Sequence, residues 1–304
     1  MKPKTAHFPP FPTARDDAGA AARQAPSTPQ TRSPSYRLAF DDADFLLRPE
    51  LRPVRLQLEL LKAELIQQEQ RVDSTVVIFG STRIADPETA ARQLAAAEEV
   101  ARSNPDDPES AQRLAAARRA ADKAVYYDEA RRLARIISRV SQENGHQDFV
   151  VVTGGGPGIM EAANRGAADV NGKSVGLSIV LPHEEQINAY VSPELSFQFH
   201  YFAVRKMHFL MRARALVAFP GGYGTLDELF ETLTLIQTGR VDRVPVLLFG
   251  EAYWRRIIDF EALVEEGAIS PADVELFCYV ETAEAAWDRI AAFYGVPIHD
   301  DNER

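Results

Sequence analysis

The sequence predicts an α/β fold in which short, buried strands form a parallel sheet. Seven runs of apolar and β-branched residues have the length of strands, and helical spacing of apolar residues follows most of them. Two runs end in glycine-rich turns that lead directly into helices, at 154–158 and 221–224. Strands that alternate with helices are typical of a parallel sheet. The predicted strands are 75–79, 148–153, 175–180, 197–202, 215–219, 244–249 and 275–280.

Composition and charge indicate a globular protein whose ligand is a small anion. The chain has 304 residues, of which 45% are hydrophobic and 26% are charged, so it can bury one large core with appended helices. Its net charge of −10 disfavours a broad attraction to nucleic acid, and any anion must be bound by a local positive site. We therefore expect a small anionic metabolite and no nucleic-acid partner.

The single cysteine and the hydropathy pattern indicate a cytoplasmic protein. Cys278 has no second cysteine with which to form an intramolecular disulfide, which fits a reducing compartment. No apolar run reaches the ~18 residues needed to cross a bilayer. The N-terminus also lacks the apolar core of a secretory signal. The expectation is a soluble, cytoplasmic chain without a membrane partner.

The chain is predicted to form one domain with appended ends. Residues 1–36 are rich in Pro, Ser, Thr, Ala and Arg, which predicts a disordered tail. An N-terminal helical segment follows at 37–71, and its apolar stripe predicts packing on the domain or on a second subunit. The domain itself is predicted at 72–296, and residues 297–304 form a polar tail.

A helical hairpin is predicted as an insertion at about 86–144, after the first strand. Asp86 followed by Pro87 is typical of a helix start, and the stretch 104–108 interrupts the helical pattern before a second start. The segment is rich in Ala, Arg and Glu. We expect it to have a structural or oligomeric role rather than a catalytic one.

The stretch 220–231, PGGYGTLDELFE, predicts an anion site. Gly221, Gly222 and Gly224 can adopt backbone angles closed to other residues and so turn main-chain N–H groups toward an anion. The helix that begins near Thr225 adds its unpaired N–H groups and the positive end of its dipole. We expect a phosphate there. The alternative is a plain strand-to-helix turn with Thr225 as the N-cap.

The second glycine turn, 154–158, repeats this logic without matching a dinucleotide or nucleoside-triphosphate motif. The fingerprint GxGxxG fails because Ile159 occupies the position of the third glycine. A Walker pattern ending in Lys173-Ser174 fails because Ala167 occupies the position of its first glycine and a strand follows. Neither NAD binding nor NTPase activity is therefore predicted.

Polar side chains follow the other strands at the edge where parallel sheets bind ligands. The loop after the first strand offers Ser81 and the Arg83 guanidinium, with a solvated surface loop as the alternative. Glu184 follows the third strand, where a solvated loop is again the alternative. A predicted helix at 203–214 carries Arg205 and Lys206, with Arg212 two turns beyond Arg205 on the same side. We predict a cationic patch there.

Glu228 supplies a carboxylate to this edge of the sheet. On a helical wheel it lies about 160° from the apolar stripe of Leu229 and Leu233, so it should point away from the core. Cleavage of a glycosidic bond passes through an oxocarbenium-like transition state that an anion stabilises, and a carboxylate can also activate water. We assign Glu228 as base or electrostatic stabiliser and Arg205 as a positioning partner. The ligand that suits the set is a nucleoside monophosphate.

The segments GGGPGIMEAANRGA (154–167), Arg205-Lys206 and PGGYGTLDE (220–228) resemble the LOG (Lonely Guy) family of cytokinin riboside 5′-monophosphate phosphoribohydrolases. Members were long labelled possible lysine decarboxylases, and many bacterial members act as AMP nucleosidases. The resemblance covers about 72–294. It implies a Rossmann-like, doubly wound fold, no metal or organic cofactor, and a homo-oligomer whose sites are completed across the dimer interface.

The resemblance also assigns residues. Arg205 and Glu228 match the catalytic pair, and the positions that match nucleotide contacts are Glu184, Lys206, Gly221, Gly222, Tyr223, Gly224, Thr225, Leu226, Asp227 and Thr234. The placement of loops at the carboxyl edge of the sheet adds Ser81, Gly154, Gly155, Gly156 and Gly158 as expected contacts. The insertion and the long N-terminal region are absent from the short plant-type members and indicate the longer bacterial class. AMP or a related purine monophosphate is therefore expected as the substrate in preference to a cytokinin nucleotide.

The sequence leaves one other function open and disfavours two. A protein of the same fold that binds a nucleotide or nucleotide-bearing cofactor without hydrolysing it is the main alternative. A decarboxylase would need a Schiff-base lysine at an enclosed pyridoxal phosphate. Lys206 is the only lysine that we can propose for this role, and it fits a phosphate contact better. The six histidines are scattered, without an HExxH motif or a cysteine cluster, so zinc hydrolysis has no support.

Overall fold

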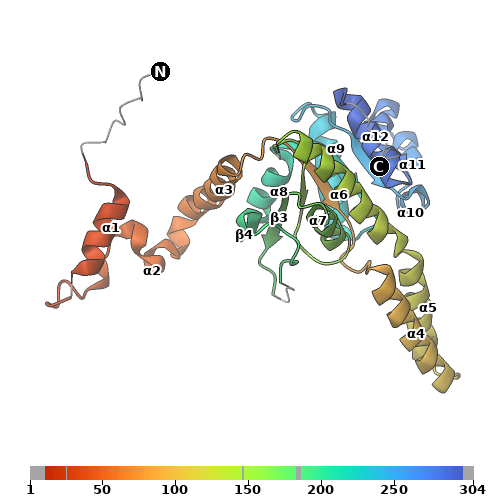
Figure 1. The fold of residues 1–304 in the computed structure, drawn as a ribbon, viewed down its shortest axis with the longest axis horizontal. Coiled ribbons are helices and arrows are strands. Elements are labelled where there is room, and N and C mark those ends of the chain that lie inside the picture. The colour runs from red at the N-terminus through yellow and green to blue at the C-terminus, as the bar shows by residue number, and fades with distance from the viewer. Residues whose placement is uncertain (1–10, 25, 146, 183–185, 297–304) are drawn as a thin grey trace. The chain divides into compact units, whose positions relative to one another are not determined.

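A computed structural model describes residues 11–24, 26–145, 147–182 and 186–296 of the chain. The chain divides into two compact units, residues 1–59 and 60–304. The first unit contains short N-terminal helices, and the second contains the sheet, its covering helices and the insertion (Figure 1).

The described part of the first unit is largely helical. Helix α1 (Ala14–Arg23) lies within the segment 1–36 that we expected to be disordered, so the structure differs from that expectation here. The backbone N–H of Thr13 donates to Asp16 Oδ2 at 3.0 Å, and Thr13 Oγ1 accepts from the N–H of Asp16 at 3.2 Å. This capping box and the alanine-rich sequence favour a helix locally, although none of its side chains is buried. The remaining elements are η1 (Pro34–Tyr36), η2 (Ala39–Asp41), α2 (Ala43–Leu46), η3 (Pro49–Leu51) and the first part of α3 (Arg52–Glu69).

The second unit is built on one parallel sheet of seven strands within the described residues, in the order β4-β3-β2-β1-β5-β6-β7. Successive strands add outward from β1 in one direction up to β4, and the order then reverses at β5. The α/β, Rossmann-like, doubly wound fold predicted from the sequence is therefore confirmed. The strands are β1 (Thr75–Phe79), β2 (Val150–Thr153), β3 (Ser174–Ile179), β4 (Ser196–Phe199), β5 (Ala213–Ala218), β6 (Val246–Phe249) and β7 (Cys278–Val280).

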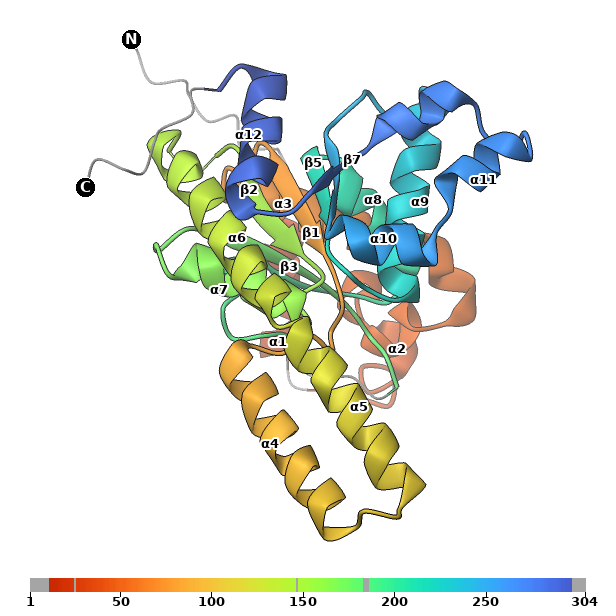
Figure 2. The same ribbon diagram turned by 90° about the vertical axis from the view of Figure 1, so that its right-hand side faces the viewer.

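Helices cover both faces of the sheet (Figure 2). Side chains from five of the strands pack in one buried cluster with α6 (Val125–Glu143), α7 (Ile159–Ala168) and α12 (Ala283–Tyr294). On the other face, Phe79 of β1 meets Phe209 of α8 (Phe202–Leu210) edge to face, with ring centroids 4.7 Å apart. The strands are continuous apolar runs because both of their faces are covered. The unit also contains η4 (Pro193–Leu195), α9 (Tyr223–Gln237), α10 (Glu251–Ile257), α11 (Phe260–Glu265) and η5 (Pro271–Leu276).

The insertion forms two helices, α4 (Pro87–Ser103) and α5 (Pro108–Asp122), that lie side by side and project from the sheet (Figures 1 and 2). Asp86 caps α4 by accepting from the N–H of Thr89 at 3.0 Å, and Asp107 caps α5 by accepting from the N–H of Ser110 at 3.0 Å. These are the starts that the sequence indicates. Helix α5 leads directly into α6, so its C-terminal end is fixed to the body of the unit.

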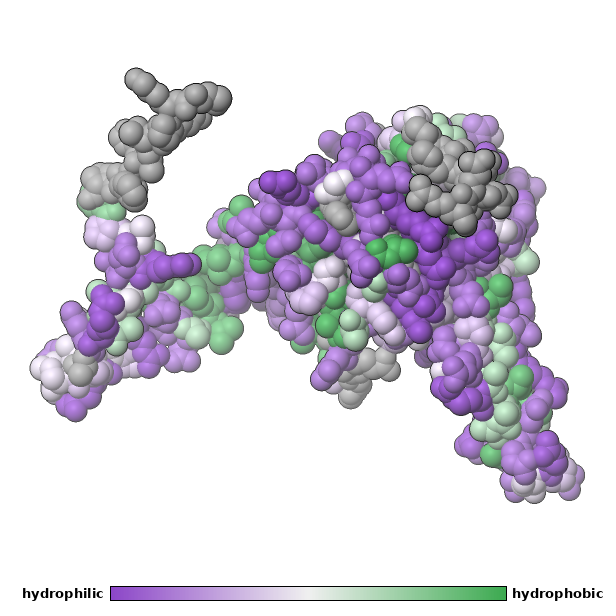
Figure 3. Space-filling view, in the orientation of Figure 1, coloured by the Kyte–Doolittle hydropathy of each residue, from purple (hydrophilic) through white to green (hydrophobic). Residues whose placement is uncertain are grey.

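The surface of the second unit is largely hydrophilic in the view of Figure 3. Among the helices of the described residues, none combines the length and the apolar character that a bilayer span requires.

Candidate functional site

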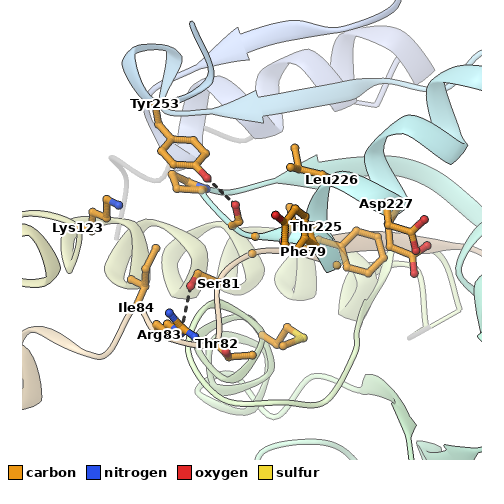
Figure 4. A pocket seen from close by; sticks show the side chains of 18 of the residues that line it. Phe79, Ser81, Thr82, Arg83, Ile84, Lys123, Thr225, Leu226, Asp227 and Tyr253 are labelled. Atoms are coloured by element: carbon orange, nitrogen blue, oxygen red, sulfur yellow. Dashed lines mark hydrogen bonds between the residues drawn. The ribbon is translucent and has the colours of Figure 1, made fainter. Parts of the chain in front are cut away.

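A cavity of about 790 Å³ opens where the strand order reverses between β1 and β5 (Figure 4). The loops that follow these two strands are joined there, because the N–H of Ser81 donates to the carbonyl of Pro220 at 3.0 Å. Crevices at such switch points are where open α/β sheets bind ligands. The cavity volume falls within the range of roughly 300–1,000 Å³ typical of small-molecule sites.

The N-terminus of α9 forms one wall of this cavity. The helix begins at Tyr223, two residues earlier than we expected, and no side chain caps it. Its first-turn N–H groups have no intrahelical partners, and its dipole places positive potential at the same end. All of the predicted contacts from Gly221 to Asp227 line the cavity. The geometry is that of an anion site.

The glycines of this turn act differently from the prediction. Gly221, Gly222 and Gly224 do not have positive φ values, so no left-handed backbone demands them. Gly221 is required by close approach, since a Cβ there would lie 2.1 Å from Thr225 Oγ1. A Cβ on Gly222 or Gly224 would meet no protein atom within 4 Å. These two glycines therefore leave open the space in front of the helix terminus.

Glu228 lies one helical turn further along α9 and faces the cavity. We expected it to point away from the core, and the structure places it at the cavity with only 6% of its surface exposed. Burial raises the pKa of Glu228 to about 7, and the nearby charges of Lys206 and Arg205 oppose that rise. Among the described residues, no side chain forms a hydrogen bond or ion pair with its carboxyl group. The carboxyl group is thus a proton acceptor available to a ligand.

Arg205 reaches the cavity from α8 and is held by three neighbours. Its Nε donates to the carbonyl of Leu177 on β3 at 2.7 Å, and its guanidinium lies 5.1 Å from the ring centroid of Phe209. A Cβ on Gly154 would lie 2.7 Å from Nη2 of Arg205, so the missing side chain of Gly154 makes room for the guanidinium. Arg205 and Glu228 thus line the same cavity, and their assignment as a catalytic pair stays a prediction.

The turn 154–158 supports the site from beneath and does not line the cavity. Gly158 has φ +72°, and a Cβ there would lie 2.4 Å from the carbonyl oxygen of Ser81. The N–H of Ile159 donates to that same oxygen at 3.2 Å. Asn188 Nδ2 donates to the carbonyls of Gly155 and Gly156, each at 3.1 Å. We predicted ligand contacts for Gly154, Gly155, Gly156 and Gly158, whereas the structure places them against protein. Ser81 itself lines the cavity.

Lys206 does not line the cavity, contrary to the predicted phosphate contact. Its Nζ pairs with Asp227 Oδ1 at 2.9 Å and with Glu231 Oε2 at 3.1 Å. Burial lowers the pKa of Lys206, but the hydrogen bonds with these two carboxylates outweigh it and raise the pKa above its ordinary value. The positive charge of Lys206 is therefore balanced by two carboxylates of the protein. Lys206 acts on the site by holding Asp227 in place and by opposing the rise in the pKa of Glu228.

Three other predicted positions lie elsewhere. Helix α8 ends at Leu210, and Arg212 pairs with both carboxylate oxygens of Glu64, at 2.6 and 2.7 Å, at the opposite edge of the sheet. Arg212 is therefore not part of a cationic patch with Arg205. Thr234 lies further along α9, where its Oγ1 donates to the carbonyl of Phe230 at 2.7 Å outside the cavity. Glu184 lies outside the described residues.

The insertion contributes side chains that the sequence did not point to. Arg119 and Lys123, at the end of α5, line the cavity, and so does Tyr253 of α10. The hydroxyl of Tyr253 donates to the carbonyl of Gly221, and the Lys123 ammonium lies 5.5 Å from the Tyr253 ring centroid. The insertion therefore borders the cavity, and its expected structural or oligomeric role stays a prediction. An Ala- and Arg-rich helix far from any motif gives no sequence signal of a cavity wall.

The described residues contain no group of three or more His, Cys, Asp or Glu side chains placed to hold a metal ion.

Comparisons with known proteins relate the same part of the chain to known families. Residues 160–290 match a family described as "possible lysine decarboxylase". A solved structure of the molybdenum cofactor carrier protein from Chlamydomonas reinhardtii is 17% identical and covers 74% of this chain and 98% of its own, with a TM-score of 0.40.

Two curated plant relatives match over 97 residues, which are 32% of this chain. The probable cytokinin riboside 5′-monophosphate phosphoribohydrolase LOGL3 of Oryza sativa subsp. japonica is 36% identical over 45% of its length. The cytokinin riboside 5′-monophosphate phosphoribohydrolase LOG3 of Arabidopsis thaliana is 35% identical over 44% of its length. The chain thus spans less than half the length of these relatives. The resemblance predicted from the motifs is confirmed: residues 160–290 match the family described as possible lysine decarboxylase, and part of the chain is similar to the LOG phosphoribohydrolases.

Proposed function

We propose that the chain hydrolyses the N-glycosidic bond of a purine nucleoside 5′-monophosphate and releases the free base and ribose 5-phosphate. AMP is the first candidate substrate, and a cytokinin riboside 5′-monophosphate is the second. The observation that carries the proposal is Glu228, a buried carboxyl group with a pKa of about 7 that faces the cavity beside Arg205. The names of the curated relatives support the same reaction class.

The position of Glu228 relative to the helix terminus matches the shape of such a substrate. The 5′-phosphate would lie at the N-terminus of α9, where Gly222 and Gly224 leave space for it. Glu228 is five residues beyond Tyr223, which corresponds to about 7 Å along the helix axis. That separation places the carboxyl group beside the ribose when its phosphate is held at the terminus.

The reaction follows from this placement. A water oxygen attacks C1′ as the bond from C1′ to the base nitrogen breaks, and positive charge develops on the sugar. The Glu228 carboxylate stabilises that charge and takes a proton from the attacking water. This proton then passes to the departing base. Arg205 orients the substrate, because its guanidinium is held by the Leu177 carbonyl and the Phe209 ring.

A product assay tests the proposal. Purified protein incubated with AMP is expected to release adenine and ribose 5-phosphate in equal amounts, measured by chromatography. Calorimetry on the same preparation measures AMP binding independently of turnover. Binding of AMP without either product would overturn the hydrolase proposal and favour a protein that only binds nucleotides.

The pH dependence of the reaction should report the Glu228 carboxyl group. Because the ionised form acts, kcat/KM for AMP is expected to rise about tenfold per pH unit below pH 7 and to level off above it. Steady-state kinetics between pH 5 and 9 at constant ionic strength measure this profile. A falling profile through pH 7 would instead assign Glu228 as a general acid and contradict its proposed role as the base.

A further inference from the structure

A group of cations lies on the cavity wall formed by the loop after β1 and the end of α5. Arg83 follows β1, whereas Arg119 and Lys123 belong to the inserted hairpin. Figure 4 shows Lys123 and Arg83 on one side of the cavity and Asp227 on the other. The carboxylates that line the cavity, Asp227 and Glu228, both come from α9. The wall of α9 carries both carboxylates, with Arg205 of α8 lining the cavity near Glu228, whereas the charged residues of this wall are all cations.

These three cations have no acidic partner within the described part of the chain. By contrast, the other arginines of α5 do have partners, because Arg113 pairs with Glu109 and Arg118 lies 3.9 Å from Glu98. Like charges that gather without counter-charges repel one another, and an anion placed between them removes that repulsion. In a chain with a net charge of −10, such a grouping indicates a site for a ligand anion.

The base of the inserted hairpin is anchored beside the helix terminus of α9. Ala124 and Tyr127, just after Lys123, are buried with 5% and 2% of their surfaces exposed. Tyr126 packs closely on Gly250, where a Cβ would lie 2.6 Å from its hydroxyl oxygen. Lys123 in turn lies over the ring of Tyr253, which donates to the carbonyl of Gly221. The base of the hairpin is therefore tied to the turn that precedes α9.

The backbone of Arg83 is held by its own loop. Its backbone N–H donates to Ser81 Oγ at 3.1 Å, and Ser81 is bonded in turn to Pro220. Hydrogen bonds and a ring contact thus connect the wall that carries these cations to the turn that precedes α9. A ligand that spans both would contact two separate positive regions of the same cavity.

We propose that Arg83, Arg119 and Lys123 form a second anion subsite that takes the second phosphate group of a ligand whose first phosphate lies at the α9 terminus. This inference rests on the proposed function and extends it to the ligand class. Nucleotides with two or more linked phosphates at the 5′ position bind this cavity more tightly than monophosphates do. A nucleoside diphosphate therefore competes with the monophosphate substrate, and the inserted hairpin confers that selectivity.

Titration with inorganic anions tests the subsite without requiring turnover. Calorimetry at 0.1 M salt is expected to give the wild-type protein a Kd for pyrophosphate about tenfold lower than that for phosphate, since added charge-assisted hydrogen bonds form. The Arg119→Ala/Lys123→Ala variant is expected to lose this preference, with its Kd for phosphate changed less than about threefold. The matched control, Arg113→Ala/Arg118→Ala, removes two charges from the same helix outside the cavity and should retain the preference.

Three results would overturn the inference. The wild-type protein could bind pyrophosphate no more tightly than phosphate, the Arg119→Ala/Lys123→Ala variant could keep the preference, or the control variant could lose it equally. The single variant Arg119→Ala, which truncates an exposed side chain, provides a second measurement if the double variant folds poorly. Failure of AMP hydrolysis would leave the anion titration unaffected, so the two proposals can fail separately.

Discussion

Replacing Glu228 with glutamine is expected to lower the rate of base release from AMP by roughly 10²–10⁴-fold, the usual contribution of a general acid or base. Glutamine keeps the size of the side chain but can neither take a proton from water nor balance the positive charge on the sugar. The variant should still bind AMP, because the phosphate is held by main-chain N–H groups at the start of α9. Single-turnover kinetics and calorimetry measure the two effects separately.

A matched control uses a carboxylate away from the cavity. Glu265 on α11 is exposed, and the described residues give it no ion pair, so Glu265→Gln removes the same charge without affecting the site. That variant should have wild-type kinetics. An unchanged kcat in Glu228→Gln would show that this carboxyl group does not act in catalysis. A variant that lost only AMP binding would make Glu228 a binding residue.

The fold and the place of the site could be predicted because they depend on local sequence patterns. Continuous apolar strands that alternate with helices predict a parallel sheet, and such sheets bind ligands at their carboxyl edge. The stretch 220–231 predicted both the end of a strand and the start of a helix at this edge. One short segment of the sequence was thus enough to predict the cavity wall that α9 forms.

The charge environment of the site could not be predicted because it depends on contacts between distant segments. Lys206 pairs with Asp227 and Glu231 from the next helix and does not line the cavity. The wheel position of Glu228 agrees with its place at the cavity, but a helical wheel shows no neighbouring segment and so could not predict the burial of the side chain. Arg212 was misplaced because the helical spacing continued past Leu210, where the chain turns into β5.

The position of the inserted hairpin beside the cavity could not be predicted from its sequence. Its capping residues identify both helices, yet nothing in the sequence shows which side of α5 returns to the cavity. That placement is decided by the anchoring of Tyr126 and Tyr127 after the hairpin. A segment that looks dispensable in sequence therefore supplies one wall of the site.

The same Glu228→Gln change should make the folded chain more stable at alkaline pH. In the folded protein the carboxyl group has a pKa of about 7, whereas its ordinary value is 4.5, because burial disfavours the charged form. Between these values the unfolded chain releases a proton that the folded chain keeps, so stability falls as pH rises from about 4.5 to 7. The difference spans about 2.5 pH units, or about 3 kcal/mol at about 1.4 kcal/mol per unit.

Glutamine carries no such penalty, so the free energy of unfolding of the variant should exceed that of the wild type by up to about 3 kcal/mol above pH 7 and by almost nothing near pH 4.5. Denaturant unfolding at pH 5 and pH 8 measures both differences, with Glu265→Gln as the control. A variant less stable than the wild type at pH 8 would mean that Glu228 is held by a stabilising ion pair. A carboxylate committed in that way could not serve as the base. The gain in stability and the loss of activity should therefore appear together, because both arise from keeping an unpaired carboxylate in a buried cavity.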